Sequence, residues 1–499
     1  MDITTSKRSQ PAYRRPGSTE PHAASDNAAR LRALLAVCVL AALPAQAAMH
    51  EHPPIAIVGV TIVDLEHDRN PRPRTVLIDD GRIVAITDPR TAPIPAGALR
   101  VDGRGRFLIP GLVDLHVHLF NGYSRRPPND WTFPLFVANG VTGVREMNAD
   151  AAALTQVRQW RRERDEGARI MPRLLATGVA VRGDTPDDAV RRVDAAADAG
   201  ADFIKVFSEL PLAQWTATLA AAQRRGLTVA GHVPAQVVLV DAATRGQSSN
   251  EHLMQAAEAC SSIGQRVIDE RRAATAEPDA TQRDAEEARV LEAFDRRACR
   301  RAADALAATR QVQVPTLVLA YEESLRAAHR REPDPRLRYL RSDERLRWER
   351  LLGDAELANG TLAQQRWRTA RRIVSIFHRA GVVVLAGTDA PMPGVYPGFS
   401  LHEELALLVE AGLSPRAALR AATVQPAQFL GLSARAGSVE IGKQADLVLL
   451  DADPTRDIRN TQRIRAVVLD GRLLSHEALD ALLENAAQAN DAKKADAPR

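Results

Sequence analysis

The ten residues Ile109–His118 read IPGLVDLHVH, and this stretch decides the fold. Its apolar residues predict a buried β-strand, in which His116 and His118 stand two positions apart. Residues i and i+2 of a strand face the same side, about 6–7 Å apart along the chain. Both imidazoles can therefore reach one metal ion. An H-x-H pair alone is a weak signal because exposed strands also carry it, but the apolar flanks argue against exposure.

Strand-like and helical segments alternate through the middle of the chain, which predicts a parallel sheet. The eight strand candidates are Phe107–Leu119, Gly140–Met147, Leu174–Val181, Phe203–Phe207, Leu227–Val233, Asn250–Leu253, Val314–Leu319 and Val382–Asp389. Eight such units over residues 110–432 predict the α/β class and a (β/α)8 TIM barrel. Residues 256–310 and 320–377 read as inserted amphipathic helices with solvated charged faces.

Two helix starts are expected after the eighth strand. Ser400 and Glu403 match an S-x-x-E capping box, and Ser414 precedes Pro415 as an N-cap residue. His402 falls in the first turn of the first of these helices, so a structural role is expected for it.

Both ends of the central region are rich in short β-strands. Residues 48–109 and 433–478 carry the hairpin-turn dipeptides Asp80-Gly81 and Asp470-Gly471. We therefore expect one small composite β-sandwich domain built from N- and C-terminal segments. Residues 479–499 form a polar tail that is expected to be partly disordered, from about Asn485.

The leading residues 1–47 read as a signal peptide. The apolar run Ala33–Leu43 has the length of a signal h-region and is too short to span a bilayer, and Ala45-Gln46-Ala47 has the small-x-small form of a cleavage site. The alternative is a buried helix. Export to the periplasm or the medium is expected, with no stable membrane anchor after cleavage. Cys260 and Cys299 then form either a disulfide or two buried thiols.

Composition is that of a globular protein. Of the 499 residues, 45% are hydrophobic and 26% are charged, which excludes wholesale disorder and a multi-span membrane protein. The net charge of +4 lies mainly in the leading segment. No nucleic-acid partner is expected, because the remaining chain is nearly neutral.

Lys205 is an unusual lysine in an arginine-rich chain. Lysine occurs at positions 7, 205, 443, 493 and 494 alone, and Lys205 stands inside the apolar strand candidate Phe203–Phe207. A desolvated lysine can lose its proton, which arginine does not do. The neutral amine can capture CO2 as a carbamate whose two oxygens bridge two cations. The alternative is a snorkelling or ion-paired lysine.

Three further polar residues end predicted strands: His232 the fifth, His252 the sixth and Asp389 the eighth. Each alone is more often structural. Together with His116, His118 and Lys205, however, they gather at the C-terminal ends of barrel strands, where barrel active sites form. Imidazole and carboxylate ligands suit Zn²⁺ and similar divalent ions.

These motifs resemble the amidohydrolase superfamily, nearest its imidazolonepropionase-like and Xaa-Pro-dipeptidase-like branch. The similar segments are Pro110–His118, Gly140–Arg145, Gly387–Asp389 and Gly442–Leu447. The resemblance implies a (β/α)8 barrel with a composite β-sandwich and two divalent metal ions. It implies that His116, His118 and Asp389 hold one ion, that His232 and His252 hold the other, and that a CO2-derived carbamate on Lys205 bridges them.

The leading functional hypothesis is an exported metal-dependent hydrolase of amide or peptide-like C–N bonds, with dipeptidase activity as the first guess. A metal-bound hydroxide attacks the carbonyl, and Asp389 moves the proton to the leaving nitrogen. Small-molecule or short peptide-like substrates are expected, contacted by Arg145 and by Tyr321 beside Glu322. A homo-oligomer is compatible with the sequence.

Two other functions remain open. One departure from the dipeptidase-like pattern is that Val233-Pro234 follows His232 where those relatives tend to carry tyrosine. The first alternative is a mononuclear cyclic-amide hydrolase, imidazolonepropionase-like, or a deaminase, against which Lys205 argues. The second is a non-catalytic binding protein on the same barrel, against which the complete ligand set argues.

Overall fold

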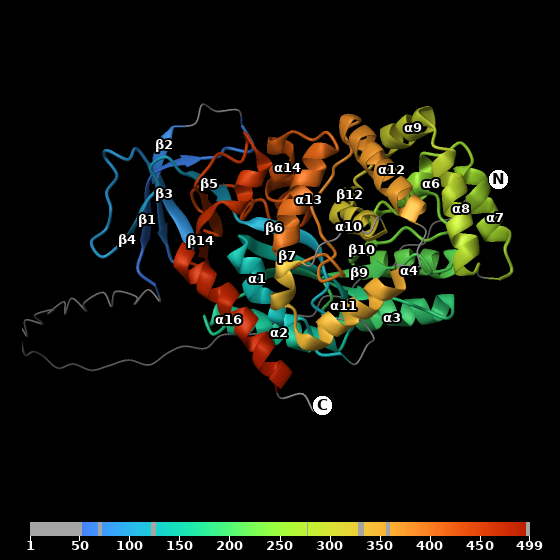
Figure 1. Ribbon diagram of the computed structural model, residues 1–499, viewed down its shortest axis with the longest axis horizontal. Helices are drawn as coiled ribbons and strands as arrows, with labels where there is room; N and C mark the ends of the chain where they lie inside the picture. The colour runs from blue at the N-terminus through green and yellow to red at the C-terminus, as the bar shows by residue number, and fades with distance from the viewer. Residues whose placement is uncertain are drawn as a thin grey trace, which may run out of the picture. The chain divides into compact units, whose positions relative to one another are not determined.

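The computed structural model describes residues 52–67, 72–120, 126–276, 278–327, 334–355 and 360–495 (Figure 1). The expected signal peptide, residues 1–47, lies outside the described residues. Within the described ranges, no helix combines the length and the apolar character needed to cross a membrane.

Seven parallel strands form the central sheet in the order β12-β11-β10-β9-β8-β7-β6. Their bounds are β6 Leu112–Val117, β7 Val141–Ala149, β8 Arg173–Ala180, β9 Phe203–Val206, β10 Thr228–Gly231, β11 Gln247–Glu251 and β12 Val312–Val314. Valine, isoleucine and leucine on these strands pack against the surrounding helices in one large core. The α/β barrel class is confirmed.

The eighth side of the barrel is less regular than a strand. Residues 382–390 make isolated parallel bridges, Gln313 with Val384 on one side and Val117 with Ala390 on the other. They therefore lie between β12 and β6 and close the ring. Gly387 lets this segment lie close to both neighbours, because a Cβ there would stand 2.6 Å from Val314 Cγ1 and 3.0 Å from His116 Cβ.

The seventh strand was predicted too far along the chain. β12 ends at Val314, and the helix α10 begins at Leu317, inside the expected strand Val314–Leu319. Thr316 between them has φ of 44°, a left-handed conformation that ends the strand.

Both ends of the central region meet in one eight-stranded sheet, ordered β15-β14-β13-β5-β1-β2-β3, with β4 beside β1. Its strands are β1 Ile55–Ile62, β2 Pro73–Asp79, β3 Arg82–Thr87, β4 Leu99–Asp102, β5 Phe107–Pro110, β13 Leu447–Leu450, β14 Ile464–Leu469 and β15 Arg472–Ser475. Figure 1 shows the red strand β14 among these blue strands. Asp80-Gly81 and Asp470-Gly471 form the predicted turns, all four residues having positive φ.

The expected single strand Phe107–Leu119 is divided between the two sheets. β5 pairs with β1 and β13, whereas β6 pairs with β7. Gly111 lies at the crossing, where a Cβ would stand 1.9 Å from Thr142 Oγ1. Only glycine lets the backbone pass from one sheet to the other at this point.

The helices follow the predicted alternation and insertions. They are α1 Phe133–Ala138, α2 Ala153–Asp165, α3 Pro186–Ala199, α4 Leu212–Arg224, α5 Leu239–Thr244, α6 Ala256–Ala259, α7 Gly264–Ala273, α8 Ala280–Glu292, α9 Arg296–Ala307, α10 Leu317–Ala327, α11 Ser342–Ala355, α12 Gly360–Arg379, α13 Phe399–Glu410, α14 Pro415–Ala421, α15 Val424–Phe429 and α16 His476–Ala495. Three short 3-10 helices are η1 Asp130–Thr132, η2 Pro335–Tyr339 and η3 Ile458–Gln462.

Details at the helix ends differ from expectation in two places. Ser400 is no cap, since α13 begins at Phe399 and the Ser400 hydroxyl donates to Glu403 Oε2 instead. The tail is ordered as helix α16 to Ala495. The N-cap at Ser414 is confirmed by its bond from Ala417 N.

Cys260 and Cys299 form a disulfide. Cys260 follows α6, and Cys299 lies in α9, so the bond ties two of the inserted helices together. Of the two sequence alternatives, the structure has the bonded form.

Candidate metal centre

The six predicted ligands lie at one end of the barrel. His116 and Lys205 are the next-to-last residues of β6 and β9. His118 follows β6, and His232 and His252 come directly after β10 and β11. Because all these strands are parallel, their carboxyl ends open on the same face. Asp389 reaches that face from the irregular eighth side.

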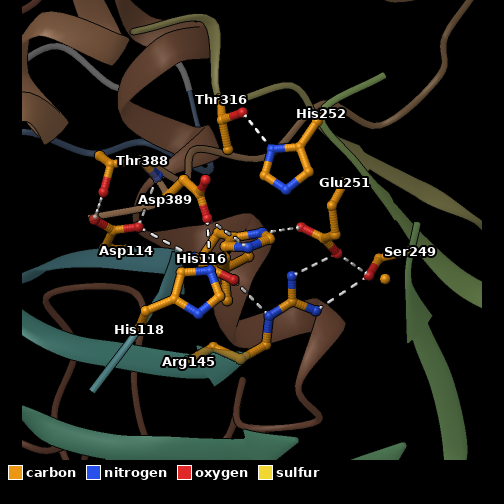
Figure 2. A network of polar contacts seen from close by, with 12 residues as sticks. Asp114, His116, His118, Arg145, Ser249, Glu251, His252, Thr316, Thr388 and Asp389 are labelled. Carbon is orange, nitrogen blue, oxygen red and sulfur yellow. Dashed lines mark hydrogen bonds and ion pairs between the residues drawn. The ribbon is translucent and has the colours of Figure 1, made fainter. Parts of the chain in front are cut away.

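Three of these side chains form the centre of the cluster. Ligand atoms of His116, His252 and Asp389 all lie within 4.8 Å of one another. His116 Nε2 is 3.0 Å and His118 Nε2 is 2.7 Å from Asp389 Oδ1 (Figure 2). The His232 ring centre is 5.0 Å from that of His252. The arrangement can hold a metal ion.

Unusual backbone conformations aim two of the ligands. His252 has φ of 57° and Asp389 has φ of 72°. Such conformations cost about 1–3 kcal/mol each in non-glycine residues and cluster at functional sites. His252 Nδ1 contacts Thr316 Oγ1 at 2.8 Å, and His232 Nδ1 contacts Ser208 Oγ at 3.0 Å. The Nε2 atoms of both rings remain for a metal.

Burial keeps these two imidazoles neutral. Desolvation lowers the pKa of His252 to about 3, and it holds the pKa of His232 well below its usual range. Burial of Asp389 acts against its ionisation, but the imidazoles of His252, His118 and His116 outweigh it and hold its pKa low. Neutral imidazole and ionised carboxylate are the protonation states that bind metal.

Lys205 enters the cluster as a buried amine. Among the described residues, its Nζ has no hydrogen-bond partner, although it lies 4.9 Å from the centre of the Phe207 ring. Desolvation lowers its pKa to about 8. Gly231 makes room for this side chain, because a Cβ there would stand 2.7 Å from Lys205 Cδ. A buried, unpartnered amine beside imidazoles fits a metal-bridging carbamate.

Arg145 and Glu251 form a buried pair that contacts the cluster through His116. Arg145 Nη2 donates to Glu251 Oε1 at 2.9 Å, and His116 Nδ1 contacts Glu251 Oε2 at 2.8 Å. Arg145 is 1% exposed, and its other donors reach Ser249 Oγ and Leu115 O. Its guanidinium is therefore engaged inside the protein. Arg145 was expected to contact substrate, and the structure gives it this supporting place instead.

Sequence reasoning missed Glu251, although a signal was present. A glutamate directly before His252 in a buried strand requires a buried partner. Burial alone would raise its pKa, but the Arg145 guanidinium and the His116 imidazole hold that pKa well below the usual range. An ionised carboxylate on Nδ1 fixes the tautomer of His116 and turns Nε2 toward the metal position.

Asp114 was also missed, and it joins β6 to the eighth side of the barrel. Its carboxylate accepts from Thr388 Oγ1 at 2.6 Å, from Thr388 N at 3.0 Å and from His116 N at 3.1 Å. Burial raises its pKa to about 7. These bonds hold the backbones of His116 and Asp389 side by side (Figure 2).

Comparison with known proteins places the chain in a family. The profile of the amidohydrolase family matches residues 107–474. The chain belongs to this family. This chain is 38% identical over 82 residues to imidazolonepropionase of Symbiobacterium thermophilum, a match that spans 16% of this chain and 18% of that enzyme.

Solved structures share the fold of this amidohydrolase. Bottromycin amidohydrolase aligns with a TM-score of 0.67 at 24% identity, covering 88% of this chain and 91% of the other. A Xaa-Pro dipeptidase with bound methionine aligns with a TM-score of 0.59 at 18% identity, covering 85% and 100%. The resemblance to the amidohydrolase family read from the sequence is confirmed.

Two secondary candidates lie in ordinary packing environments. In this chain, the ring of Tyr321 packs against that of Trp367, and the two ring centres lie 5.1 Å apart. His402 is buried between Thr461 Oγ1 at 2.9 Å and Asn139 O at 3.0 Å. The structural role expected for His402 is confirmed.

Proposed function

We propose that the chain is an exported metal-dependent amidohydrolase that cleaves an amide or peptide-like C–N bond in a dipeptide-like substrate. The observation that carries the proposal is Lys205, a fully buried amine whose Nζ has no hydrogen-bond partner among the described residues. Leaving such a group unmet costs about 1–3 kcal/mol or more. A carbamate between two cations removes that cost.

The chain offers ligands for two divalent ions. His116, His118 and Asp389 would hold one, His232 and His252 the other, with the Lys205 carbamate shared. The nitrogen and carboxylate donors fit Zn²⁺. Bound ions at such a site lower the pKa of water and polarise a carbonyl oxygen.

Asp389 is the residue that would move the proton. Its Oδ1 meets both His116 and His118, which leaves Oδ2 to accept a proton from the attacking water. The same oxygen then returns the proton to the leaving nitrogen. Asp114 and Thr388 position Asp389 through the backbone bonds described above.

A mononuclear cyclic-amide hydrolase is the second candidate. Two observations favour it: among the described residues the compact cluster consists of His116, His252 and Asp389, and the imidazolonepropionase match reaches 38% identity over 82 residues. This alternative assigns no role to Lys205.

Metal content per chain separates the two candidates. Wild-type protein purified with bicarbonate and without chelator is compared with Lys205→Met. Lys443→Met is the control, because Lys443 pairs with Glu440 at 3.2 Å in the turn before β13, away from the cluster. Two ions in wild type and in the control, with fewer in Lys205→Met, support the binuclear proposal. One ion in all three proteins supports the mononuclear candidate. Hydrolysis of dipeptides and N-acyl amino acids is then compared with that of cyclic amides.

Export is a separate part of the proposal. The signal-like residues 1–47 and the Cys260–Cys299 disulfide support it, since disulfides persist in oxidising compartments. Mass spectrometry of the native protein tests it. A mature chain that begins just after Ala47 is expected, and full-length protein in the cytosol would refute export.

A further inference from the structure

Arg182 stands on the same face of the barrel as the candidate metal centre. It follows β8 by two residues, and its side chain is exposed. Its guanidinium carbon lies 4.2 Å from the centre of the Phe207 ring. That ring in turn contacts His232, 5.1 Å between ring centres, in an edge-to-face arrangement. Phe207 therefore separates Arg182 from the metal ligands by one ring.

The guanidinium of Arg182 has no counter-ion among the residues that the structure describes. Two other arginines that stack on aromatic rings differ in this respect: Arg145 pairs with Glu251, and Arg336 pairs with Asp334. Stacking restricts the long side chain, while the five N–H donors stay available. The stacked guanidinium is therefore an oriented cation one aromatic ring away from His232.

We propose that Arg182 binds the free carboxylate of the substrate. The substrate class is then an amide whose leaving group is an α-amino acid, such as a dipeptide or an N-acyl amino acid. This inference rests on the proposed function and narrows it. The planar guanidinium fork matches a carboxylate through two parallel hydrogen bonds. Arg145, the other arginine considered for this task, has its donors engaged with Leu115, Ser249 and Glu251.

Distance supports the assignment. In an α-amino acid leaving group, one nitrogen and one Cα separate the scissile carbonyl carbon from the carboxylate carbon, which keeps them within about 4 Å. A carboxylate anchor must therefore lie beside the metal ligands. Arg182 lies one aromatic ring away from His232, because Phe207 contacts both residues, and the sequence Val233-Pro234 after His232 provides no hydroxyl or cation for the task.

The test compares Arg182→Met with Arg245→Met. Arg245 is the matched control: it is exposed and stacks on Trp215 at 5.6 Å, but it precedes β11 and so lies at the opposite end of the barrel. Each protein is assayed with a cleaved dipeptide and with the C-terminal amide of that dipeptide. We expect Arg182→Met to lower kcat/KM for the free acid about 10–100-fold, mainly through KM, and to leave the amide unaffected. Arg245→Met should change neither value.

A binding measurement keeps the inference separate from the proposed function. Calorimetry on the metal-loaded proteins measures binding of a free amino acid and of its amide. We expect the wild type to prefer the acid and Arg182→Met to lose that preference, whether or not a dipeptide is cleaved. An equal loss for acid and amide, or an unchanged preference in Arg182→Met, overturns the role of Arg182. A wild type that keeps the preference but cleaves no amide overturns the proposed function alone.

Discussion

Replacing Glu251 by glutamine should weaken metal binding without touching a ligand atom. The Glu251 carboxylate accepts from both His116 Nδ1 and Arg145 Nη2. A glutamine has one carbonyl oxygen, so it can face one of these two donors while its NH2 group opposes the other. The variant therefore loses either the orientation of His116 or the partner of Arg145.

Both losses have sizes that can be estimated. Outer partners of metal-bound histidines typically contribute 10–100-fold in affinity, which is about 1.4–2.8 kcal/mol. Removing one charge of a buried pair costs about 3–5 kcal/mol of stability. Arg145 is 1% exposed, so the full range applies to it. The double variant Arg145→Met/Glu251→Gln removes both charges and should recover most of the stability, but not the metal affinity.

Competition with a chromophoric chelator measures the affinity, and urea denaturation of the apo proteins measures the stability. Glu404→Gln is the matched control, because Glu404 is equally buried but accepts from Val318 N at the start of α10. Its metal affinity should equal that of wild type. If folded Glu251→Gln binds metal as tightly as wild type, Glu251 does not orient His116.

Three further outcomes are expected. Asp389→Asn should lower kcat about 10²–10⁴-fold and change KM much less, as measured by steady-state kinetics; a near-normal kcat would contradict its proton-moving role. Burial raises the pKa of Glu404 to about 8, above its unfolded value, so wild-type stability should fall as pH rises from about 5 through 8. Between these two pH values, the free energy of unfolding of Glu404→Gln should fall by at least about 1.4 kcal/mol less than that of wild type, as measured by denaturation. An equal fall in both proteins would exclude an ionisation cost at Glu404. The disulfide spans a sequence separation of 39 residues, so the Cys260→Ser/Cys299→Ser variant should lose about 3–4 kcal/mol. Reductant should lower the melting temperature of wild type and leave this variant unchanged, and an insensitive wild type would argue against the bond.

The barrel and most of the candidate metal-binding residues could be predicted because they follow from local patterns in the sequence. Short, continuously apolar strands, their alternation with helices and the turn dipeptides Asp80-Gly81 and Asp470-Gly471 are all local signals. The carboxyl ends of parallel strands lie on one face of a barrel, so His116, Lys205 and His252 could be grouped from the sequence. Asp389 followed from the same rule, although its segment is not a regular strand.

The predictions that failed concern side-chain partners and exact element ends, which the residue patterns alone do not fix. Arg145 carries the charge of a substrate anchor, and only its contact with Glu251 shows that this charge is used internally. β12 ends before Pro315, which has no N–H for the sheet, and the left-handed Thr316 follows; the sequence contained the proline signal, but the expected strand was drawn across it. Ser400 has the capping-box sequence, but its hydroxyl bonds Glu403 inside a helix that has already begun.

The sheet shared by both ends of the chain also governs when folding can finish. Strand β5 leads directly into β6, yet its partner β13 joins Pro110 to Leu447, near the end of the sequence. Until the last strands have been synthesised, β5 keeps one bare edge, and contacts so distant along a chain form slowly. In a nascent chain, β5 therefore keeps an unpaired edge while residues 111–446 are synthesised. Chaperones that bind extended segments have their longest opportunity at β5, and a truncation before residue 447 should aggregate there.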